Sequence, residues 1–458
     1  MVMDAVVERC AEQSPVTVMA RLALQRALEP AWIDELFERE RGAQYTRELL
    51  FSTMVELMSV VAVGLRPSVH AAAKACKDLP VSVQALYDKI KGTAPNLVRA
   101  LVQGSAARLG EVLAPMIKDK SPTVRGYRLR IVDGNHLPAS EKRLKPLRGF
   151  RGAALPGQSL VIYDPDLDMV VDLVPCEDGH AQERTLMASA QANAQDTDLW
   201  IADRNFSTRG ILCGWASRGS GFIVREHGRT PNPQALDEAR YRGRIETGAV
   251  YEQAVAIEEE AGQMLRLRRV EVHLDHPTED GDSTIRLLTN LPKSHFTARK
   301  IARLYRRRWQ IESLFQRLES VLQSEVASLG HPRAALLAFG VAVMAYNVLS
   351  LLQSAVWVAH DLQTTDIELS SYFLADEIRV HYAGMMMAVA IAAWERYEAL
   401  TAVQLGRVLL QIAKHANPMA LRKHPRGSKP SKKIGYVSAA VARRHVSTAR
   451  VLKDGMIR

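Results

Sequence analysis

The sequence is poor in cysteine and lacks a secretory signal. Its 458 residues include four cysteines, and no two of them form a CxxC pair. This excludes a structural zinc site built on cysteine pairs and favours free thiols in a reducing cytosol. The amino terminus, MVMDAVVERCAEQ, carries acidic residues and no basic segment followed by an apolar one. Secretion is therefore not indicated, and we expect a cytoplasmic protein.

One long stretch lacks charge. From Ala334 to His360 no residue is charged at neutral pH apart from the terminal histidine. This length approaches the ~20 residues that span a bilayer. Polar residues such as Tyr346 and Asn347 interrupt the stretch at its centre, and no second candidate accompanies it. A buried helix in a large soluble domain is the preferred interpretation, and a membrane span is the alternative.

Positive charge is in excess. The chain has 60 Lys and Arg against 50 Asp and Glu, which gives a net charge of +10. This excess favours a polyanionic partner. The last segment, Leu421 to Arg458, has eleven Lys or Arg against the single Asp454. This basic tail is either a non-specific DNA contact or a solvated tail.

The chain begins with a helical region. Apolar residues at three-and-four spacing predict helices through residues 1 to about 120, including two short ones around Leu79-Pro80. A helix-turn-helix that touches DNA and an ordinary helical packing module fit this region equally well.

The pattern changes to strands near residue 127. The runs YRLRIVDGN, SLVIYD and MVVDLVPCE predict three strands, followed by a helix over residues 183–194. A fourth strand, DLWIADRNF, precedes a helix that Ser207 or Thr208 can cap, and GFIVREHG predicts a fifth strand. Residues 229 to about 290 are again rich in strand signals.

Two aspartates stand at strand ends in this series. Asp133 precedes the turn-forming residues that end the first strand, and Asp203 lies at the carboxyl end of the fourth. His136 follows Asp133 closely and either lines a site or is structural. Asp164, Asp166 and Asp168 fall in a hairpin turn, where aspartate is favoured for turn chemistry over metal binding.

A third acidic residue lies on an amphipathic helix predicted over residues 297–323. Glu312 falls at the margin of the apolar face, where its carboxylate can reach inward toward a site. Arg308 precedes it by four residues, and a surface pair worth only ~0.2–0.5 kcal/mol is the plain alternative. Arg303, Arg306 and Arg307 point elsewhere and are candidates to meet phosphates. The predicted core stripe consists of Leu304, Ile311, Phe315, Leu318 and Leu322.

Short motifs around these residues resemble one family. Tyr305, Arg308 and Glu312 match the signature Y-x2-R-x3-E of the bacterial insertion-sequence transposases known as the IS-four family. The segments VDGN, IADRNF, LLTNLP and AYNVL also look like that family. The amino-terminal LFERERGAQYTRELLF and VSVQALYDKIKG resemble its helical leader, so the resemblance runs from roughly residue 30 to residue 350.

The resemblance implies a DDE transposase with a ribonuclease H-like α/β fold, a mixed sheet flanked by helices and interrupted by a β insertion. Its acidic triad would be Asp133, Asp203 and Glu312, holding two Mg²⁺ or Mn²⁺ ions, which prefer oxygen ligands. The implied partners are double-stranded DNA, as terminal inverted repeats and target, and a second copy in a synaptic homodimer. The residues expected to contact DNA are Tyr305, Arg306, Arg307, Arg308 and Trp309.

The resemblance also sets domain boundaries. The expected segments are a helical DNA-end-binding region (1–120), a first part of the catalytic core (121–228), a β insertion (229–290), a second part with the glutamate helix (291–360) and a helical C-terminal region with the basic tail (361–458).

The chain departs from the family at one position. The signature continues with a lysine seven residues after the glutamate, and this position is Glu319 here. A lysine would contact DNA phosphate, whereas a glutamate repels it. Arg317 or a nearby arginine is a candidate to compensate. In relatives a flipped base stacks on an aromatic of the β insertion, where Tyr241 and Tyr251 are the only tyrosines, and the choice between them stays open.

Three functions follow from these observations. The leading hypothesis is metal-dependent cleavage of transposon ends and strand transfer. The second is a degenerate transposase that binds DNA without cutting it, which Glu319 favours. The third is a nuclease of the same fold that does not join strands.

Overall fold

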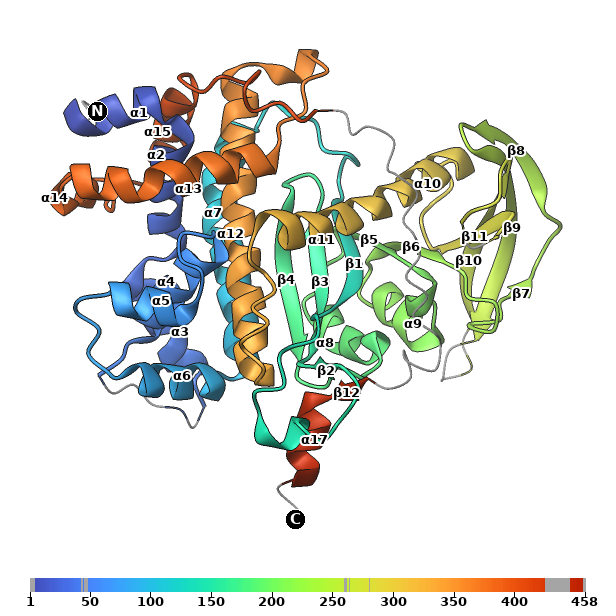
Figure 1. Cartoon of the computed structure of the whole chain (residues 1–458). Coiled ribbons are helices and arrows are strands. Elements are labelled where there is room, and N and C mark those ends of the chain that lie inside the picture. The colour runs from blue at the N-terminus through green and yellow to red at the C-terminus, as the bar shows by residue number, and fades with distance from the viewer. Residues whose placement is uncertain are drawn as a thin grey trace.

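Runs of valine, isoleucine and leucine assemble into one ten-stranded mixed sheet, in the order β4-β3-β1-β5-β6-β11-β10-β9-β7 with β8 paired to β9. Helices flank this sheet, as Figure 1 shows. The computed structural model describes residues 5–42, 44, 48–258, 262, 264–279, 281–424 and 445–455. The predicted α/β class, a large mixed sheet flanked by helices, is confirmed.

The first five predicted strands lie side by side at one end of the sheet. β1 pairs antiparallel with β3 and parallel with β5, which pairs parallel with β6. This order is consistent with a ribonuclease H-like fold. The strands are β1 (Arg128–His136), β3 (Gln158–Asp164), β4 (Met169–Cys176), β5 (Asp198–Ala202) and β6 (Gly221–Arg225).

The connections between these strands are short helices. The helix predicted over 183–194 is a 3-10 turn, η2 (Glu183–Leu186), followed by α8 (Met187–Gln191). Between β5 and β6 lie η3 (Arg204–Phe206) and α9 (Arg209–Ala216). Thr208 caps α9, because its side chain accepts a hydrogen bond from the backbone N–H of Ile211.

The strands between residues 234 and 289 continue the same sheet. β11 pairs antiparallel with β6, with Leu288 opposite Val224, so this stretch begins where the first five strands end. The sequence predicts strands here but not their partner, because periodicity reports one strand at a time. The strands are β7 (Gln234–Ala235), β8 (Arg240–Ile245), β9 (Gly248–Glu258), β10 (Met264–Leu274) and β11 (Thr284–Thr289).

Helices from both ends of the chain gather on the β4 side of the sheet (Figure 1). The long helices α7 (Pro95–Met116) and α12 (Pro332–Ala359) contact each other and β4. The remaining helices there are α1 (Ala5–Gln13), α2 (Pro15–Ala27), α3 (Pro30–Glu40), α4 (Phe51–Ala62), α5 (Val69–Ala75), α6 (Val83–Gly92), α13 (Ser371–Ala388), α14 (Ile391–Glu395) and α15 (Ala402–Ala413).

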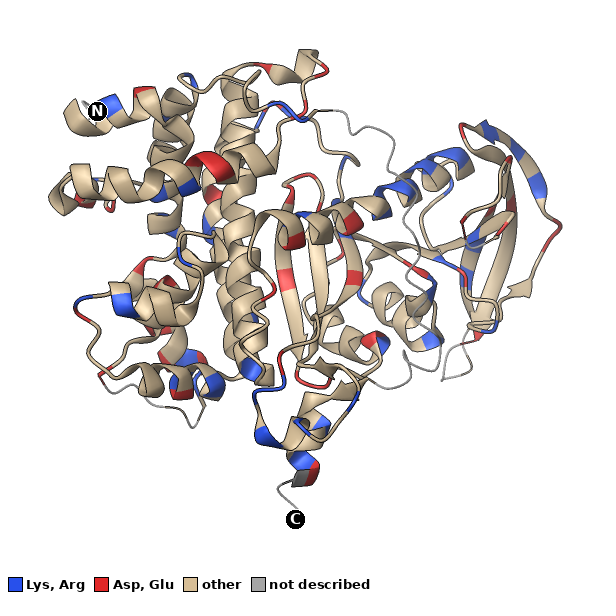
Figure 2. Ribbon diagram, in the orientation of Figure 1, with Lys and Arg blue, Asp and Glu red and all other residues tan. Residues whose placement is uncertain are grey.

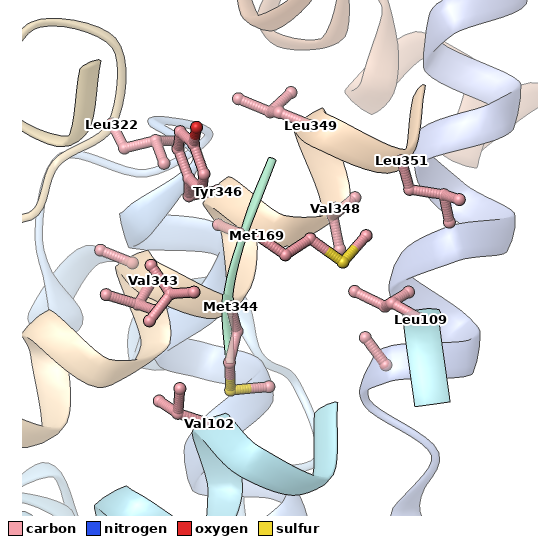
Figure 3. Close-up of a cluster of buried hydrophobic side chains, with 14 of the residues drawn as sticks. Val102, Leu109, Met169, Leu322, Val343, Met344, Tyr346, Val348, Leu349 and Leu351 are labelled. Atoms are coloured by element: carbon pink, nitrogen blue, oxygen red, sulfur yellow. The ribbon is translucent and has the colours of Figure 1, made fainter. Parts of the chain in front are cut away.

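The uncharged stretch forms a core helix. Among the described residues α12 alone is long and apolar enough to cross a membrane, and 94% of its most apolar window is buried inside the protein. Figure 3 shows side chains of α7, β4 and α12 meeting in this core, among them Leu109, Met169 and Val343. The burial matches the preferred interpretation of a buried helix.

The described part of the carboxyl-terminal segment forms a separate two-stranded sheet with the loop after β1. Residues 425–444 and 456–458 of the predicted basic tail lie outside the described residues. Within the described part, β12 (Val446–Ser447) pairs parallel with β2 (Ala154–Leu155), and α17 (Thr448–Gly455) contacts the short turn η1 (Lys145–Leu147). A segment distant in sequence therefore lies against the loop that follows β1.

Asn347 explains why the apolar run of α12 is interrupted at its centre. The buried side-chain amide of Asn347 donates to the Val170 carbonyl at 2.8 Å and accepts from the Val170 N–H at 2.9 Å. Val170 lies on β4, the edge strand, so the amide satisfies two backbone groups that no further strand pairs.

We predict that Asn347→Leu lowers the free energy of unfolding by about 2–4 kcal/mol, because both backbone groups of Val170 become buried and unpaired. Urea denaturation followed by circular dichroism measures the change. Ser350→Ala, about one turn along the same helix, is the control and should cost less than about 1 kcal/mol. An equal loss in the two variants would contradict this role of the amide.

Candidate active site

Two of the predicted acidic residues lie beside each other where the parallel pairing of β1 with β5 ends. The predicted strand end at Gly134 and Asn135 is wrong, because β1 continues to His136 through its pairing with β3. Val132 of β1 is in register with Ala202 of β5, so Asp133 and Asp203, the next residues, are neighbours. Burial, and then the charge of Asp203, raise the pKa of Asp133 to about 7. The Asp203 carboxylate accepts a hydrogen bond from the Asn205 N–H at 2.7 Å, which fixes its orientation. The fold therefore concentrates negative charge at this edge.

The third acidic residue is brought to the same place by an arginine. The Arg308 guanidinium donates to Asp133 at 3.2 Å and to Glu312 at 2.6 Å. Because one guanidinium contacts both carboxylates, Glu312 lies within a side chain's reach of Asp133. Arg308 and Glu312 are therefore not an isolated surface pair, because Arg308 also contacts Asp133 on β1.

A break in the predicted helix turns Arg308 toward the strands. The predicted single helix is instead α10 (Ala298–Tyr305), a 3-10 turn η4 (Arg306–Arg308) and α11 (Trp309–Val321). The tighter turn changes the helical phase after Tyr305. Leu314, which the predicted stripe omitted, is fully buried, while Phe315 is only partly buried. Glu312 keeps about a third of its side chain exposed, as expected for the margin of the buried face.

The carboxylates form an electrostatic site for a cation, which Arg308 occupies in this structure. Among the described residues no three Asp, Glu, His or Cys side chains are arranged to hold a metal ion as they stand. The oxygen donors nevertheless fit a hard divalent ion, and the raised pKa of Asp133, which comes from burial and then from Asp203, reflects negative charge that a cation would relieve. Asp133, Asp203 and Glu312 are the residues that would hold such an ion.

A fourth acidic side chain, missed by the sequence analysis, borders the site. Glu183 accepts a hydrogen bond from the Asn205 side chain at 2.8 Å and lies 3.6 Å from the ring of His136. It packs over Gly134, where any side chain would collide with it. No motif pointed to Glu183, because it stands in a 3-10 turn rather than at a strand end. His136 lines the edge of the site through this contact.

The residues predicted to contact DNA divide into buried and exposed members. Tyr305 is 8% exposed and lies behind Arg308, and burial first of all raises the pKa of its hydroxyl to about 12. Trp309 is 62% exposed, and the Arg308 guanidinium lies 5.2 Å from its ring centroid. Arg306 pairs with Glu246 at 3.1 Å, and Arg307 is partly buried.

Protein groups engage the three aspartates of the β3–β4 turn. Asp164 pairs with Arg130, and Asp166 accepts from the N–H of Thr123. Asp168 accepts two hydrogen bonds from Arg317, at 3.0 and 3.2 Å. These contacts agree with the preferred turn interpretation.

Arg317, a candidate to compensate for Glu319, has its guanidinium bound to Asp168, and compensation by Arg317 or a nearby arginine stays a prediction. Glu319 itself is exposed and lines a small hollow beside Asn135 and Glu325. Burial, and then the charge of Glu319, raise the pKa of Glu325. Negative charge therefore remains where the family carries a lysine.

The two tyrosines in the strands after β6 contact each other. The Tyr241 and Tyr251 ring centroids are 5.5 Å apart, and Tyr251 stacks on His273 at 4.6 Å. Tyr241 is 56% exposed and is the more accessible of the two. Which of them meets a base stays a prediction.

We predict that Asp133→Asn stabilises the metal-free protein above pH 7. The folded state raises the pKa of Asp133 from 3.8 to about 7, so ionisation lowers stability progressively as pH rises between these values. At pH 8 in a chelator the variant should be about 1–2 kcal/mol more stable than the parent, and at pH 4 the two should agree. Chemical denaturation at both pH values measures this.

The exposed Asp376 of α13 supplies the control for that measurement. Asp376→Asn should leave the difference between pH 8 and pH 4 unchanged. If Asp133→Asn gained no stability at pH 8, the cost of ionising Asp133 that we assign to its burial and to the charge of Asp203 would be refuted.

Known sequences similar to this chain carry the same type of domain. Residues 125–348 match the family described as Transposase DDE domain. Over 243 residues the chain is 25% identical to InsL of Escherichia coli K12, named as a candidate transposase of insertion sequence element IS186A, and to the Escherichia coli transposase for insertion sequence element IS421. Each alignment covers 46% of this chain and 62% of the relative, so it spans less than two thirds of the relatives' length. Residues 125–348, which hold all three acidic residues, are therefore similar to a DDE transposase domain.

Proposed function

We propose that this protein is a DDE-type transposase that cleaves transposon ends and transfers the freed strands into target DNA. The observation that carries the proposal is the convergence of Asp133, Asp203 and Glu312 around Arg308, within the DDE domain. The names of the relatives, transposases of insertion sequences, support the same activity. The signature of Tyr305, Arg308 and Glu312 supports placement in the IS-four family.

The reaction needs divalent metal, and the three carboxylates are the residues that would hold it. Two Mg²⁺ or Mn²⁺ ions supply an activated nucleophile and stabilise the leaving oxygen in phosphodiester cleavage. Asp133, Asp203 and Glu312 would hold these ions through their carboxylate oxygens. Arg308 exchanges its two carboxylate partners for a DNA phosphate, which frees the oxygens and positions the substrate.

The DNA path passes over the outer face of α10 and η4. Figure 2 shows Lys and Arg along α10, next to the site. Arg306, Arg307 and the exposed Trp309 lie on this stretch and would contact DNA backbone and base. The predicted partners, terminal inverted repeats, target DNA and a second copy in a synaptic homodimer, complete this proposal, with a cytoplasmic location at the nucleoid.

A second group of cations continues this path. We call residues 141–155 and 445–455 the basic lobe; it holds seven Lys or Arg against Glu141 and Asp454. The lobe follows β1 directly, and its Glu141 N–H donates to the Ala327 carbonyl in the loop after α11 at 2.9 Å. In the described part of the chain Lys145, Arg148 and Arg151 are exposed and have no acidic partner. Such unpaired cations favour contact with phosphates over internal pairing.

A degenerate protein that binds DNA without cutting it is not favoured. Glu319 is the feature that supports it, but Glu319 lies in the hollow beside Asn135 and leaves the three carboxylates in place. A plasmid excision assay with Mg²⁺ separates the two functions.

We predict that Asp133→Asn, Asp203→Asn and Glu312→Gln each reduce strand cleavage by at least about 10³-fold, since each removes a metal oxygen ligand. Binding of transposon-end DNA should change less than about threefold, because no DNA contact is removed. Cleavage of a labelled end and electrophoretic mobility shift measure the two properties. Asp376→Asn, distant on α13, is the control, and cleavage by any triad variant would remove that residue from the site.

We predict that the triple variant Lys145→Gln, Arg148→Gln and Arg151→Gln reduces the slope of log affinity against log salt by about 2–3, because each lost phosphate contact removes about 0.9. Fluorescence anisotropy with duplex DNA measures the slope. The control replaces three exposed cations on the opposite side of the molecule with glutamine, Arg396, Arg407 and Lys414, and should leave the slope unchanged. Equal slopes in all three proteins would exclude the basic lobe from the DNA path.

A further inference from the structure

A buried polar cluster joins the helix of Glu312 to the sheet and to the core helix. Asp168, at the tip of the β3–β4 hairpin, accepts hydrogen bonds from Arg317 of α11 at 3.0 and 3.2 Å. The Tyr163 hydroxyl of β3 and the Tyr346 hydroxyl of α12 donate to the same Asp168 oxygen at 2.5 and 2.6 Å. The Arg317 guanidinium also lies 5.1 Å from the Tyr346 ring centroid. Four elements therefore meet at one carboxylate.

The two tyrosines of the cluster are buried, whereas Asp168 and Arg317 each keep more than a quarter of the side chain exposed. Tyr163 and Tyr346 are each 2% exposed. Burial, and then the charge of Asp168, raise the pKa of each tyrosine well above its ordinary value, so both hydroxyls stay protonated as donors. Asp168 adopts a left-handed backbone conformation, with φ of 52°, to present its carboxylate there. Such a conformation is maintained where surrounding contacts over-determine it.

We propose that the Asp168–Arg317 ion pair is a positioning device that sets the rotation and height of α11 and thereby places Glu312 at the carboxylate site. This inference rests on the proposed function of Glu312. Arg317 is five residues after Glu312, about one and a half helical turns, so a shift of α11 at Arg317 moves Glu312 with it.

Asp168 is held in place by the strands that carry Asp133. Tyr163 of β3 is in register with Ile131 of β1, two residues before Asp133. Tyr346 anchors the same carboxylate to α12, which lies in the core. The cluster therefore fixes the position of Glu312 relative to Asp133, although the two residues are more than a hundred residues apart in sequence. Contacts of this kind hold a ligand in orientation without touching the metal.

An ion pair elsewhere provides the matched control. Arg99 of α7 contacts Asp172 of β4 at 2.9 and 2.7 Å, in a similarly half-buried two-point geometry. This pair ties a helix to the strand of the same hairpin but makes no contact with α11. Loss of either pair should lower stability, and only loss of the Asp168–Arg317 pair should affect Glu312.

The test is a double-mutant cycle read out by Mn²⁺ binding to the full-length chain, followed by the electron paramagnetic resonance signal of the free ion. Asp168→Asn should weaken Mn²⁺ binding by about tenfold, as for other residues that orient a metal ligand. Glu312→Gln should weaken it as well. The double variant should bind no more weakly than Glu312→Gln alone, because Asp168 acts through Glu312. Asp172→Asn should bind Mn²⁺ like the parent.

A second pair of variants keeps the test valid if Asp168→Asn does not fold. Arg317→Lys keeps the charge but loses the two-point contact, and Tyr346→Phe removes one donor. Both should weaken Mn²⁺ binding in the parent and not in the Glu312→Gln background. Additive losses in the cycle, or parental binding in Arg317→Lys, would overturn the positioning role. If Glu312→Gln bound Mn²⁺ like the parent, the proposed site itself would fail instead.

Discussion

Mutual repulsion of carboxylates is the constraint on which the site depends. A fold that collects Asp133, Asp203 and Glu312 at one sheet edge must supply a cation, because buried like charges raise each other's cost of ionisation. In this chain Arg308 supplies it, and it does so through the 3-10 turn that separates α10 from α11. The turn therefore has an electrostatic purpose, since a continuous helix would direct Arg308 differently.

The rest of the structure holds the opposing charges in place. β1 and β5 fix two of the acidic residues through backbone hydrogen bonds, which leave little freedom in their spacing. The third depends on side chains instead, since α11 reaches the sheet through Arg308 at its start and Arg317 near its middle. Behind both lies the apolar core of α7 and α12, which gives the sheet a rigid backing.

The sequence predicted the parts of this arrangement that depend on local pattern. The apolar run before Asp203 places it at a strand end, and helical periodicity places Glu312 at the margin of a buried face. The strand end predicted after Asp133 was wrong, because pairing with β3 carries β1 on to His136. Glu183 and the partner of Arg317 could not be predicted, because both depend on which segments meet in space. The break at Arg306 was also missed, since three arginines in a row fit a helix as well as a tighter turn.

The pairing of β11 with β6 divides the chain into segments whose length is fixed by the sheet and a segment, between these two strands, whose length is less constrained. The chain leaves the sheet after Arg225 and returns to the edge of that same strand at Thr284. The loops between these strands can change in length without displacing β1 or β5, whereas β8, β9 and β10 contact α10 and support it. Longer loops add closure entropy only slowly, so such changes cost little stability. The loops in this part of the molecule can therefore be resized with little effect on the strands that carry Asp133 and Asp203.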